Sequence, residues 1–151
     1  MLFFTHILFG LLIALLFKSF LPEINYWLFL FLVLLGSIFP DIDEPNSKIV
    51  NWSGFIGKII SFFSHHRGFF HSLFFILLIS LILNLFLSIY YLFGLVLGLF
   101  SHLFLDSLTK QGIVLFYPLP YFKLKGWMVT GGIIEWLIRL IFLVLIIYLL
   151  I

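Results

Sequence analysis

Two side chains able to bind a metal ion, His102 and Asp106, lie four positions apart at the end of a long apolar run. If that segment is helical, both project from one face and can reach the same ion. The spacing also fits an ordinary helix end whose histidine forms a hydrogen bond with a neighbouring group. Inside a membrane a site is favoured, because ionisable side chains near the hydrocarbon are costly and tend to mark functional positions.

Acidic side chains form a second group, Asp41, Asp43 and Glu44, directly after Pro40. Alternate acids in an extended turn can point toward one cation, and close carboxylates repel each other unless a cation or a proton relieves them. The chain has five histidines and no cysteine, so disulfides and thiolate sites are excluded. Nearby histidines favour Zn²⁺ or Mn²⁺ over Ca²⁺. The alternative is a hydrated loop whose acids hold the preceding helix at the membrane surface.

The densest polar segment is His66-Arg67-Gly68-Phe69-Phe70-His71-Ser72. His66 and His71 are candidate ligands, and Arg67 can hold an anion such as phosphate through two parallel hydrogen bonds. The alternative is a basic anchor that touches anionic lipid headgroups. His65 is expected to be a solvated interfacial residue.

Two further candidates are isolated in apolar surroundings. His6 lies among Phe and Leu residues, where a histidine needs a partner, and a neighbouring helix is the simplest source of one. Glu135 and Arg139 are four apart, a spacing typical of an ion pair within a helix. Spacing alone therefore gives no support for metal binding by Glu135.

The overall composition is that of an integral membrane protein. Of 151 residues, 64% are hydrophobic and 9% are charged, whereas soluble domains are about half apolar and a quarter charged. Residues 68–105 include no Asp, Glu, Lys or Arg, and as helices they suffice for two crossings of a hydrocarbon core about 30 Å thick. No cluster of basic and aromatic residues indicates nucleic acid, so we expect membrane lipid as the environment and no nucleic-acid partner.

The apolar segments predict an all-α integral membrane protein with a single domain, residues 1–151. We expect about five transmembrane helices, at residues 1–20, 25–39, two within 68–105 that reverse near 88–91, and 130–151. Apolar residues at helical spacing within residues 50–64 predict one short interfacial helix. The first 17 residues lack the basic start and cleavage pattern of a signal peptide, so they are expected to remain as a membrane helix.

Five crossings would bring the polar residues to one face of the membrane. Residues 41–67 and 106–130 then lie on the side of the amino terminus. That side carries six basic residues against Lys18 on the other: Lys48, Lys58, Arg67, Lys110, Lys123 and Lys125. The positive-inside rule makes it the cytoplasmic side of the inner or plasma membrane. All five histidines and every acid except Glu23 lie at or near that face, which predicts a metal site there.

Three strings of the sequence carry a family resemblance. They are Phe39-Pro40-Asp41-Ile42-Asp43, His66 to Ser72, and Ser101-His102-Leu103-Phe104-Leu105-Asp106-Ser107-Leu108-Thr109, with Gly112 and Tyr117-Pro118 after them. In this order they closely resemble the membrane-bound metal-dependent hydrolases of the YdjM type, over about residues 6–135. That family is distantly similar to zinc-dependent phospholipase C and the fungal single-strand nucleases, which bind a metal cluster through His, Asp and Glu.

The resemblance implies a metal centre built from eight residues: His6, Asp41, Asp43, His66, His71, His102, Asp106 and Glu135. The soluble relatives use more histidines and the mature amino-terminal group as ligands, whereas here Met1 precedes His6 by more than a helical turn. The number of ions per chain therefore stays open between one and three. Zinc is the expected metal, with manganese as the alternative.

The resulting hypothesis is a membrane-bound metal-dependent hydrolase that resembles phospholipase C. A metal-activated water would cleave a phosphoester of a lipid or another amphiphile, with Asp43 or Glu135 as general base and Arg67 binding the substrate's negative charge. A non-catalytic membrane protein with a structural metal site and a metal-ion transporter are the alternatives. The almost purely apolar helices expected within residues 68–105 speak against a permeation path. The sequence predicts no oligomeric state.

Overall fold

The computed structural model describes residues 1–64, 66–119 and 122–151, and most of them are helical. Its longer helices are α1 (Phe3–Phe17), α2 (Tyr26–Ile38), α6 (Ile89–Ser107) and α7 (Ile133–Leu150). The shorter ones are α3 (Lys48–Trp52), α4 (Gly54–Phe63) and α5 (Leu73–Leu83). Four segments are long and apolar enough to cross a membrane: Phe3–Phe20, Tyr26–Asp43, Ile89–Ser107 and Ile133–Leu150. The prediction of a helical membrane protein is therefore confirmed in outline.

Helix α5 is shorter than a membrane crossing, so the described residues contain four candidate spans where we expected about five. Its 11 residues extend about 16 Å, roughly half of the hydrocarbon thickness. The helix starts later than the uncharged run, because Phe69–His71 form a 3-10 turn before it. Ser72 then caps α5 by accepting a hydrogen bond from the Phe75 amide. The reversal falls at residues 84–88, slightly before the predicted 88–91.

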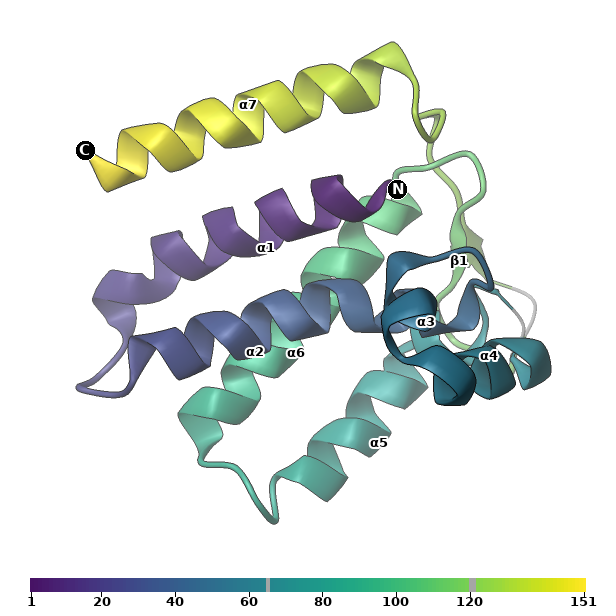
Figure 1. The fold of residues 1–151 in the computed structure, drawn as a ribbon, viewed down its shortest axis with the longest axis horizontal. Helices are drawn as coiled ribbons and strands as arrows, with labels where there is room; N and C mark the ends of the chain where they lie inside the picture. Colours follow the sequence, from purple (N-terminus) through teal and green to yellow (C-terminus); the bar gives the residue numbers. More distant parts are fainter. Residues whose placement is uncertain (65, 120–121) are drawn as a thin grey trace.

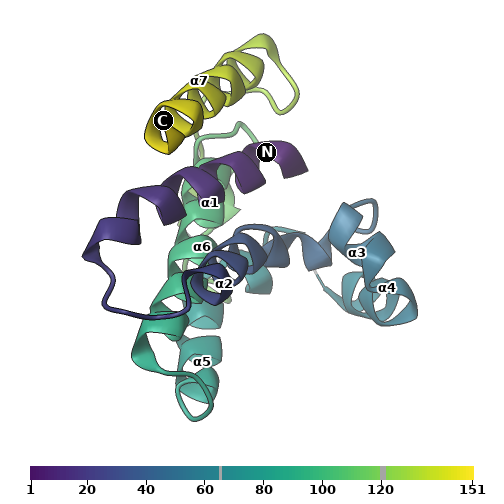
Figure 2. The same cartoon turned by 60° about the vertical axis from the view of Figure 1, so that its left-hand side comes forward.

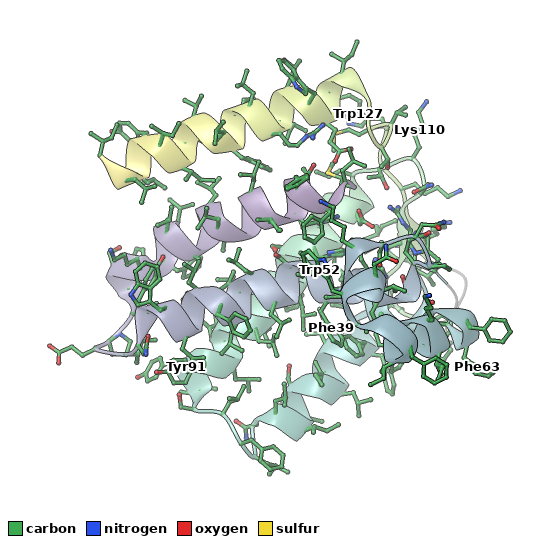
Figure 3. The ribbon with its side chains drawn as sticks, in the orientation of Figure 1. Phe39, Trp52, Phe63, Tyr91, Lys110 and Trp127 are labelled. Carbon is green, nitrogen blue, oxygen red and sulfur yellow. The ribbon has the colours of Figure 1, made fainter. Side chains whose placement is uncertain are left out.

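The segment expected as one interfacial helix is divided into α3 and α4. Ser47 caps α3 by accepting from the Val50 amide, and the break follows at Gly54, whose φ of +58° is easy only for glycine. Large apolar side chains remain exposed along both helices: Trp52, Phe55, Ile56, Phe62 and Phe63. Figure 3 shows Phe63 projecting away from the bundle at the end of α4. This exposed apolar face is what an interfacial helix pair requires.

Close contact between α2 and α6 forms the centre of the bundle. A Cβ atom on Gly98 would lie 2.1 Å from the Val33 carbonyl oxygen, and one on Gly36 would lie 2.3 Å from the Leu95 carbonyl oxygen. The two backbones therefore touch at these glycines, as is common for helices that pack within membranes. Helix α1 packs against α2, α6 and α7, and Figures 1 and 2 show α7 running along the outer side of α1.

The connection from α6 to α7 contains a small sheet, whereas we expected an all-α protein. Strand β1 (Ile113–Val114) pairs antiparallel with β2 (Lys123–Leu124), so the fold is not purely helical. The connection returns the chain to the end of the bundle where α1 starts. There the starts of α1, α5 and α7 meet the ends of α2 and α6 (Figure 1). This arrangement agrees with the predicted gathering of polar residues at one face.

Candidate metal centre

His102 and Asp106 both project inward from the last turns of α6 and are fully buried. The carbonyl oxygen of Ser37, near the end of α2, lies 2.7 Å from His102 Nδ1. Because a carbonyl oxygen only accepts hydrogen bonds, Nδ1 carries the proton and Nε2 keeps a free lone pair. Asp106 Oδ2 lies 4.0 Å from that Nε2, so the expected pair forms on one helix face.

Asp43 fixes the orientation of His71. The α-helix ends before Pro40, and the 3-10 turn Phe39–Asp43 brings the buried Asp43 carboxylate against the turn that precedes α5. Its Oδ2 lies 2.9 Å from His71 Nδ1. With that nitrogen donating to the carboxylate, the lone pair of His71 resides on Nε2, as in the carboxylate–histidine–metal arrangements of many metal sites.

The free nitrogens of the two histidines face each other. His71 Nε2 and His102 Nε2 lie 3.1 Å apart, and each has a lone pair toward the other. Two such lone pairs repel unless a proton or a metal ion lies between them. Nitrogens bound to one tetrahedral zinc, each about 2.0–2.1 Å from it, would be about 3.3 Å apart. The observed separation therefore fits a shared cation.

Two carboxylates and a third histidine complete the ligand atoms. Asp106 Oδ2 lies 3.7 Å from His71 Nε2, and Asp41 Oδ1 lies 3.6 Å from His102 Nε2. His6 stacks on His102 at a ring separation of 3.8 Å, and neither of its buried nitrogens has a hydrogen-bond partner. Within the described part of the chain, the groups able to hold an ion are His6–Asp41–His102 and His71–His102–Asp106.

Arg67 binds the loop after α6 to the centre. Its φ of +62° is unusual for a residue with a side chain, and its amide donates to Asp43 Oδ2 at 3.1 Å. Its Nη1 donates to Thr109 Oγ1 at 2.7 Å and to the Gly112 carbonyl at 3.1 Å. Its Nη2 lies 2.9 Å from Asp106 Oδ2. Most of the guanidinium is therefore used within the protein.

His66 lies beside the two ligand groups and is not part of them. Its Nδ1 lies 2.9 Å from Asp43 Oδ1, and its Nε2 lies 3.3 Å from both Arg67 Nε and Glu44 Oε2. Burial lowers the pKa of His66, but the hydrogen bond to Asp43 and the charges of Asp43 and Glu44 outweigh it and raise the pKa above its usual value. His66 is thus an acid–base group held by two carboxylates.

Glu135 joins the start of α7 to the start of α1 and also lies outside the two groups. Its Oε1 accepts from the Leu2 amide at 2.7 Å and from the Thr5 hydroxyl, and its Oε2 accepts from the Gly131 amide at 2.7 Å. Among the described residues no ion pair joins Glu135 to Arg139, so the spacing-based alternative for this pair is not realised. Every Glu135 oxygen is used to hold two helix starts together.

A cavity of about 320 Å³ opens beside the centre. Asp41 lines it and is the ligand candidate closest to solvent, with its side chain 15% exposed. His66 and Arg67 line it as well. The remaining lining comes from Met1 to Phe3, from Glu44, Asn46, Ser47 and Lys48 between α2 and the start of α3, and from Gln111 and Thr130 in the connection between α6 and α7. A small polar molecule could therefore approach the buried ligands from the side of Asp41.

The structure brings together all eight predicted ligands but separates their roles. Five of them supply the atoms of the two ligand groups, namely His6, Asp41, His71, His102 and Asp106. Asp43, His66 and Glu135 surround these and hold them in place. His65 lies outside the described residues.

Sequence reasoning missed Ser37, Thr5 and Thr109. Ser37 contributes through its carbonyl oxygen, which every residue has, so no signal in the sequence could identify it. Thr5 directly precedes His6 in the sequence, and Thr109 comes three positions after Asp106. A search for hydroxyl groups next to the candidate ligands would have found both. The amino group of Met1 also contacts Asp106 Oδ1.

Comparisons with known proteins agree with the resemblance seen in the sequence. The chain matches the family described as "YdjM inner membrane protein" over residues 1–151. It is 35% identical over 106 residues to the uncharacterized protein YvsG of Bacillus subtilis. The aligned residues cover 69% of this chain and 66% of YvsG.

It is also 34% identical over 124 residues to the inner membrane protein YdjM of Escherichia coli. The aligned residues cover 75% of this chain and 63% of that protein. The same values hold for the inner membrane protein YdjM of Shigella flexneri. The chain thus spans slightly less than two thirds of the length of these curated relatives. No solved structure matches it.

Proposed function

Because the chain belongs to the YdjM family of inner membrane proteins, and because buried histidines and aspartates meet at one end of its helix bundle, we propose that it is a membrane-bound metal-dependent hydrolase. The proposed substrates are phosphoesters of lipids or other amphiphiles. The observation that carries the proposal is the pair of imidazole lone pairs that face each other 3.1 Å apart next to an open cavity. A buried, ordered ligand set with an accessible side is what a catalytic metal site needs.

We propose a single divalent cation, zinc or manganese, held by His71, His102 and Asp106 with Asp41 and His6 completing the set. His102 belongs to both ligand groups, but its Nδ1 is committed to the Ser37 carbonyl. Only one nitrogen of His102 remains to bind metal, so the two groups describe one centre more readily than two. When bound, such an ion supplies Lewis-acid chemistry: it acidifies water and offsets the charge that develops on a phosphoryl oxygen.

The surrounding residues have separate tasks in this proposal. Asp43 and the Ser37 carbonyl orient the imidazoles of His71 and His102. Arg67 holds Asp106, and with its remaining donor capacity it faces the cavity, where it would bind the substrate's phosphate. Asp43 and Glu135 were the expected general bases, but their oxygens are occupied by hydrogen bonds.

His66 is the better placed group for proton transfer. It lines the cavity, its side chain is 33% exposed, Asp43 holds its Nδ1, and its Nε2 lies 3.3 Å from Glu44 Oε2. A partly exposed imidazole that is oriented by a carboxylate suits acid–base catalysis. In the proposed reaction the protonated His66 exchanges its Nε2 contact with Glu44 for the leaving oxygen of the phosphoester, and gives that oxygen its Nε2 proton.

The centre is proposed to face the cytoplasm. The end of the bundle that holds it carries most of the basic residues, whereas Lys18 lies at the opposite end, after α1. The ends of the candidate spans support placement at headgroup depth. His6 lies in the first turn of α1, Asp41 in the 3-10 turn after α2, His71 in the 3-10 turn before α5, and His102 and Asp106 in the last turns of α6.

The proposal is tested by assaying purified protein against a lipid panel in mixed micelles. The panel contains phosphatidic acid, phosphatidylglycerol, phosphatidylethanolamine and cardiolipin, and the products measured are phosphate, free headgroup and diacylglycerol. We expect release of one of these products, its loss on treatment with a chelator, and its recovery on adding back zinc or manganese.

Variants separate a catalytic centre from a structural one. His66→Gln should keep the bound metal and lose most of the turnover, whereas His102→Ala should lose both. Ser107→Ala is the control on α6, because its hydroxyl contacts only the Phe104 carbonyl of its own helix. If the metal binds and no panel lipid is cleaved, the structural-site alternative replaces the hydrolase.

A further inference from the structure

The cavity beside the metal centre has a cationic rim. Lys48, the first residue of α3, lines it. Its Nζ lies 4.0 Å from the centre of the Phe4 ring and 4.8 Å from that of Phe3, so cation–π contacts hold the ammonium against the start of α1. No carboxylate of the described residues forms an ion pair with Lys48. Its charge is therefore available to an anion in the cavity.

Other residues that line the cavity can also bind an anion. Arg67 lines it, and the neutral donors Asn46, Ser47, Gln111 and Thr130 surround the space. Glu44 is the one acid besides Asp41 in the lining, and its carboxylate lies 3.3 Å from His66 Nε2. A volume of about 320 Å³ is at the lower end of the range for small-molecule pockets. It suits a phosphate headgroup and excludes a folded partner.

One side of the mouth is apolar and continuous with membrane-facing side chains. Leu2 and Phe3 line the cavity, and Trp52 of α3 packs edge-on against Phe3 with ring centres 5.3 Å apart. Phe4 is 55% exposed and Trp52 is 66% exposed, and Figure 3 shows Trp52 beside the start of α1. Aromatic side chains at the end of a candidate span are typical of the headgroup level of a bilayer.

We propose that this cavity takes the phosphate headgroup of an anionic lipid whose acyl chains lie beside the start of α1 and α3, with Lys48 as the residue that selects for phosphate. The acyl chains remain in the bilayer against Phe4 and Trp52 while the phosphate lies between Lys48 and Arg67, beside Asp41. The inference rests on the proposed function for the identity of the site, and it adds the headgroup class and the residue that selects for it.

Binding is measured without turnover, so that the two proposals can fail separately. The probe is a fluorescent long-chain phosphatidic acid diluted into detergent micelles that contain the full chain. The competitors are unlabelled phosphatidic acid, diacylglycerol with the same chains but no phosphate, and glycerol 3-phosphate with the same headgroup but no chains. We expect phosphatidic acid to compete at least about tenfold better than either partial ligand, since each lacks one half of the contacts.

The matched variants are Lys48→Gln and Lys58→Gln. Both lysines are exposed and lie on the interfacial helix pair, but Lys58 is not part of the cavity lining. Removing one charge-assisted contact should weaken the binding of phosphatidic acid about tenfold in Lys48→Gln. Lys58→Gln should stay within about twofold of wild type, because a distant surface charge contributes little. Equal metal content in both variants shows that neither has lost its fold.

Three results would overturn the inference. They are equal weakening by both variants, competition by glycerol 3-phosphate as strong as that by phosphatidic acid, and competition by diacylglycerol as strong as that by phosphatidic acid. The second would make the site one for free phosphomonoesters, and the third would make the headgroup irrelevant. Binding as expected with no lipid cleaved would leave this inference standing and refute the hydrolase. Cleavage with an unchanged KM in Lys48→Gln would support the hydrolase and refute this inference.

Discussion

The substitution Gly98→Ala tests whether the contact between α2 and α6 positions the metal ligands. A Cβ atom at this position would meet the Val33 carbonyl oxygen at 2.1 Å, and real Cβ atoms essentially never come closer than 3.0 Å to another atom. The two backbones must therefore separate by roughly 0.9 Å at this crossing, since neither is a flexible side chain.

The next turn of both helices holds the hydrogen bond between Ser37 and His102. That bond is 2.7 Å long, and a separation of roughly 0.9 Å would lengthen it to about 3.6 Å, beyond hydrogen-bond range. His102 would then lose the partner that fixes its tautomer and ring orientation. Loss of such an outer partner typically weakens metal affinity about 10–100-fold. Overpacking should also lower the free energy of unfolding by about 1–3 kcal/mol.

Gly94→Ala is the matched control on the same helix. Its added Cβ would meet the Phe29 ring at 2.9 Å and the Phe29 carbonyl oxygen at 3.3 Å. The ring can move, and the contact lies two turns away from His102, so metal affinity should stay within about threefold of wild type although stability can fall. Metal affinity is measured by competition with a chromogenic chelator at fixed pH, and stability by unfolding in SDS. Wild-type affinity in Gly98→Ala, or equal losses in both variants, would refute the positioning role of this helix contact.

Three further substitutions test the residues around the ligands. Asp43→Asn leaves one carbonyl oxygen to accept from either His66 or His71, so metal affinity measured with the same chelator should fall about 10–100-fold; an unchanged affinity would contradict the orienting role. Glu135→Gln turns an amide donor toward the Leu2 amide, the Thr5 hydroxyl or the Gly131 amide, all of which donate to Glu135. This should lower the free energy of unfolding by about 1–3 kcal/mol, while the variant should keep its full metal content. Loss of the metal in that variant would instead make Glu135 a ligand. Arg67→Lys cannot reproduce the forked contacts to the loop after α6, so limited trypsin digestion should cut that loop faster than in wild type, and equal rates would count against this role.

The long apolar helices were predictable from the sequence because lipid requires long uncharged segments. Asn25 caps α2 at the expected place, where its side chain accepts from the Trp27 and Leu28 amides. The uncharged run after Gly68 was less informative, because hydrophobicity alone does not say where a helix starts within it. Polar contacts decide this instead, since His71 and Ser72 are held outside α5 by Asp43 and by the helix cap.

The gathering of the candidate ligands at one end of the bundle was predictable, but the contacts of each one were not. Residue types identify which atoms can bind a metal, and the expected membrane crossings bring those residues to one face. Which atom each carboxylate faces depends on packing between helices far apart in the sequence. Asp43 faces two imidazole Nδ1 atoms and Glu135 faces the start of α1, and no spacing rule reports either contact. The β1–β2 pair was missed because two-residue strands leave almost no pattern.

The metal content of the purified protein tests the central claim most directly. We predict one divalent cation per chain by elemental analysis, with X-ray absorption showing two or three nitrogen ligands at about 2.0–2.1 Å. We further predict that His102→Ala and Asp106→Asn lose the ion while Ser107→Ala keeps it. Protein that takes up no zinc or manganese, or that binds the ion equally well without His102 and Asp106, would contradict the claim that these residues form a metal centre.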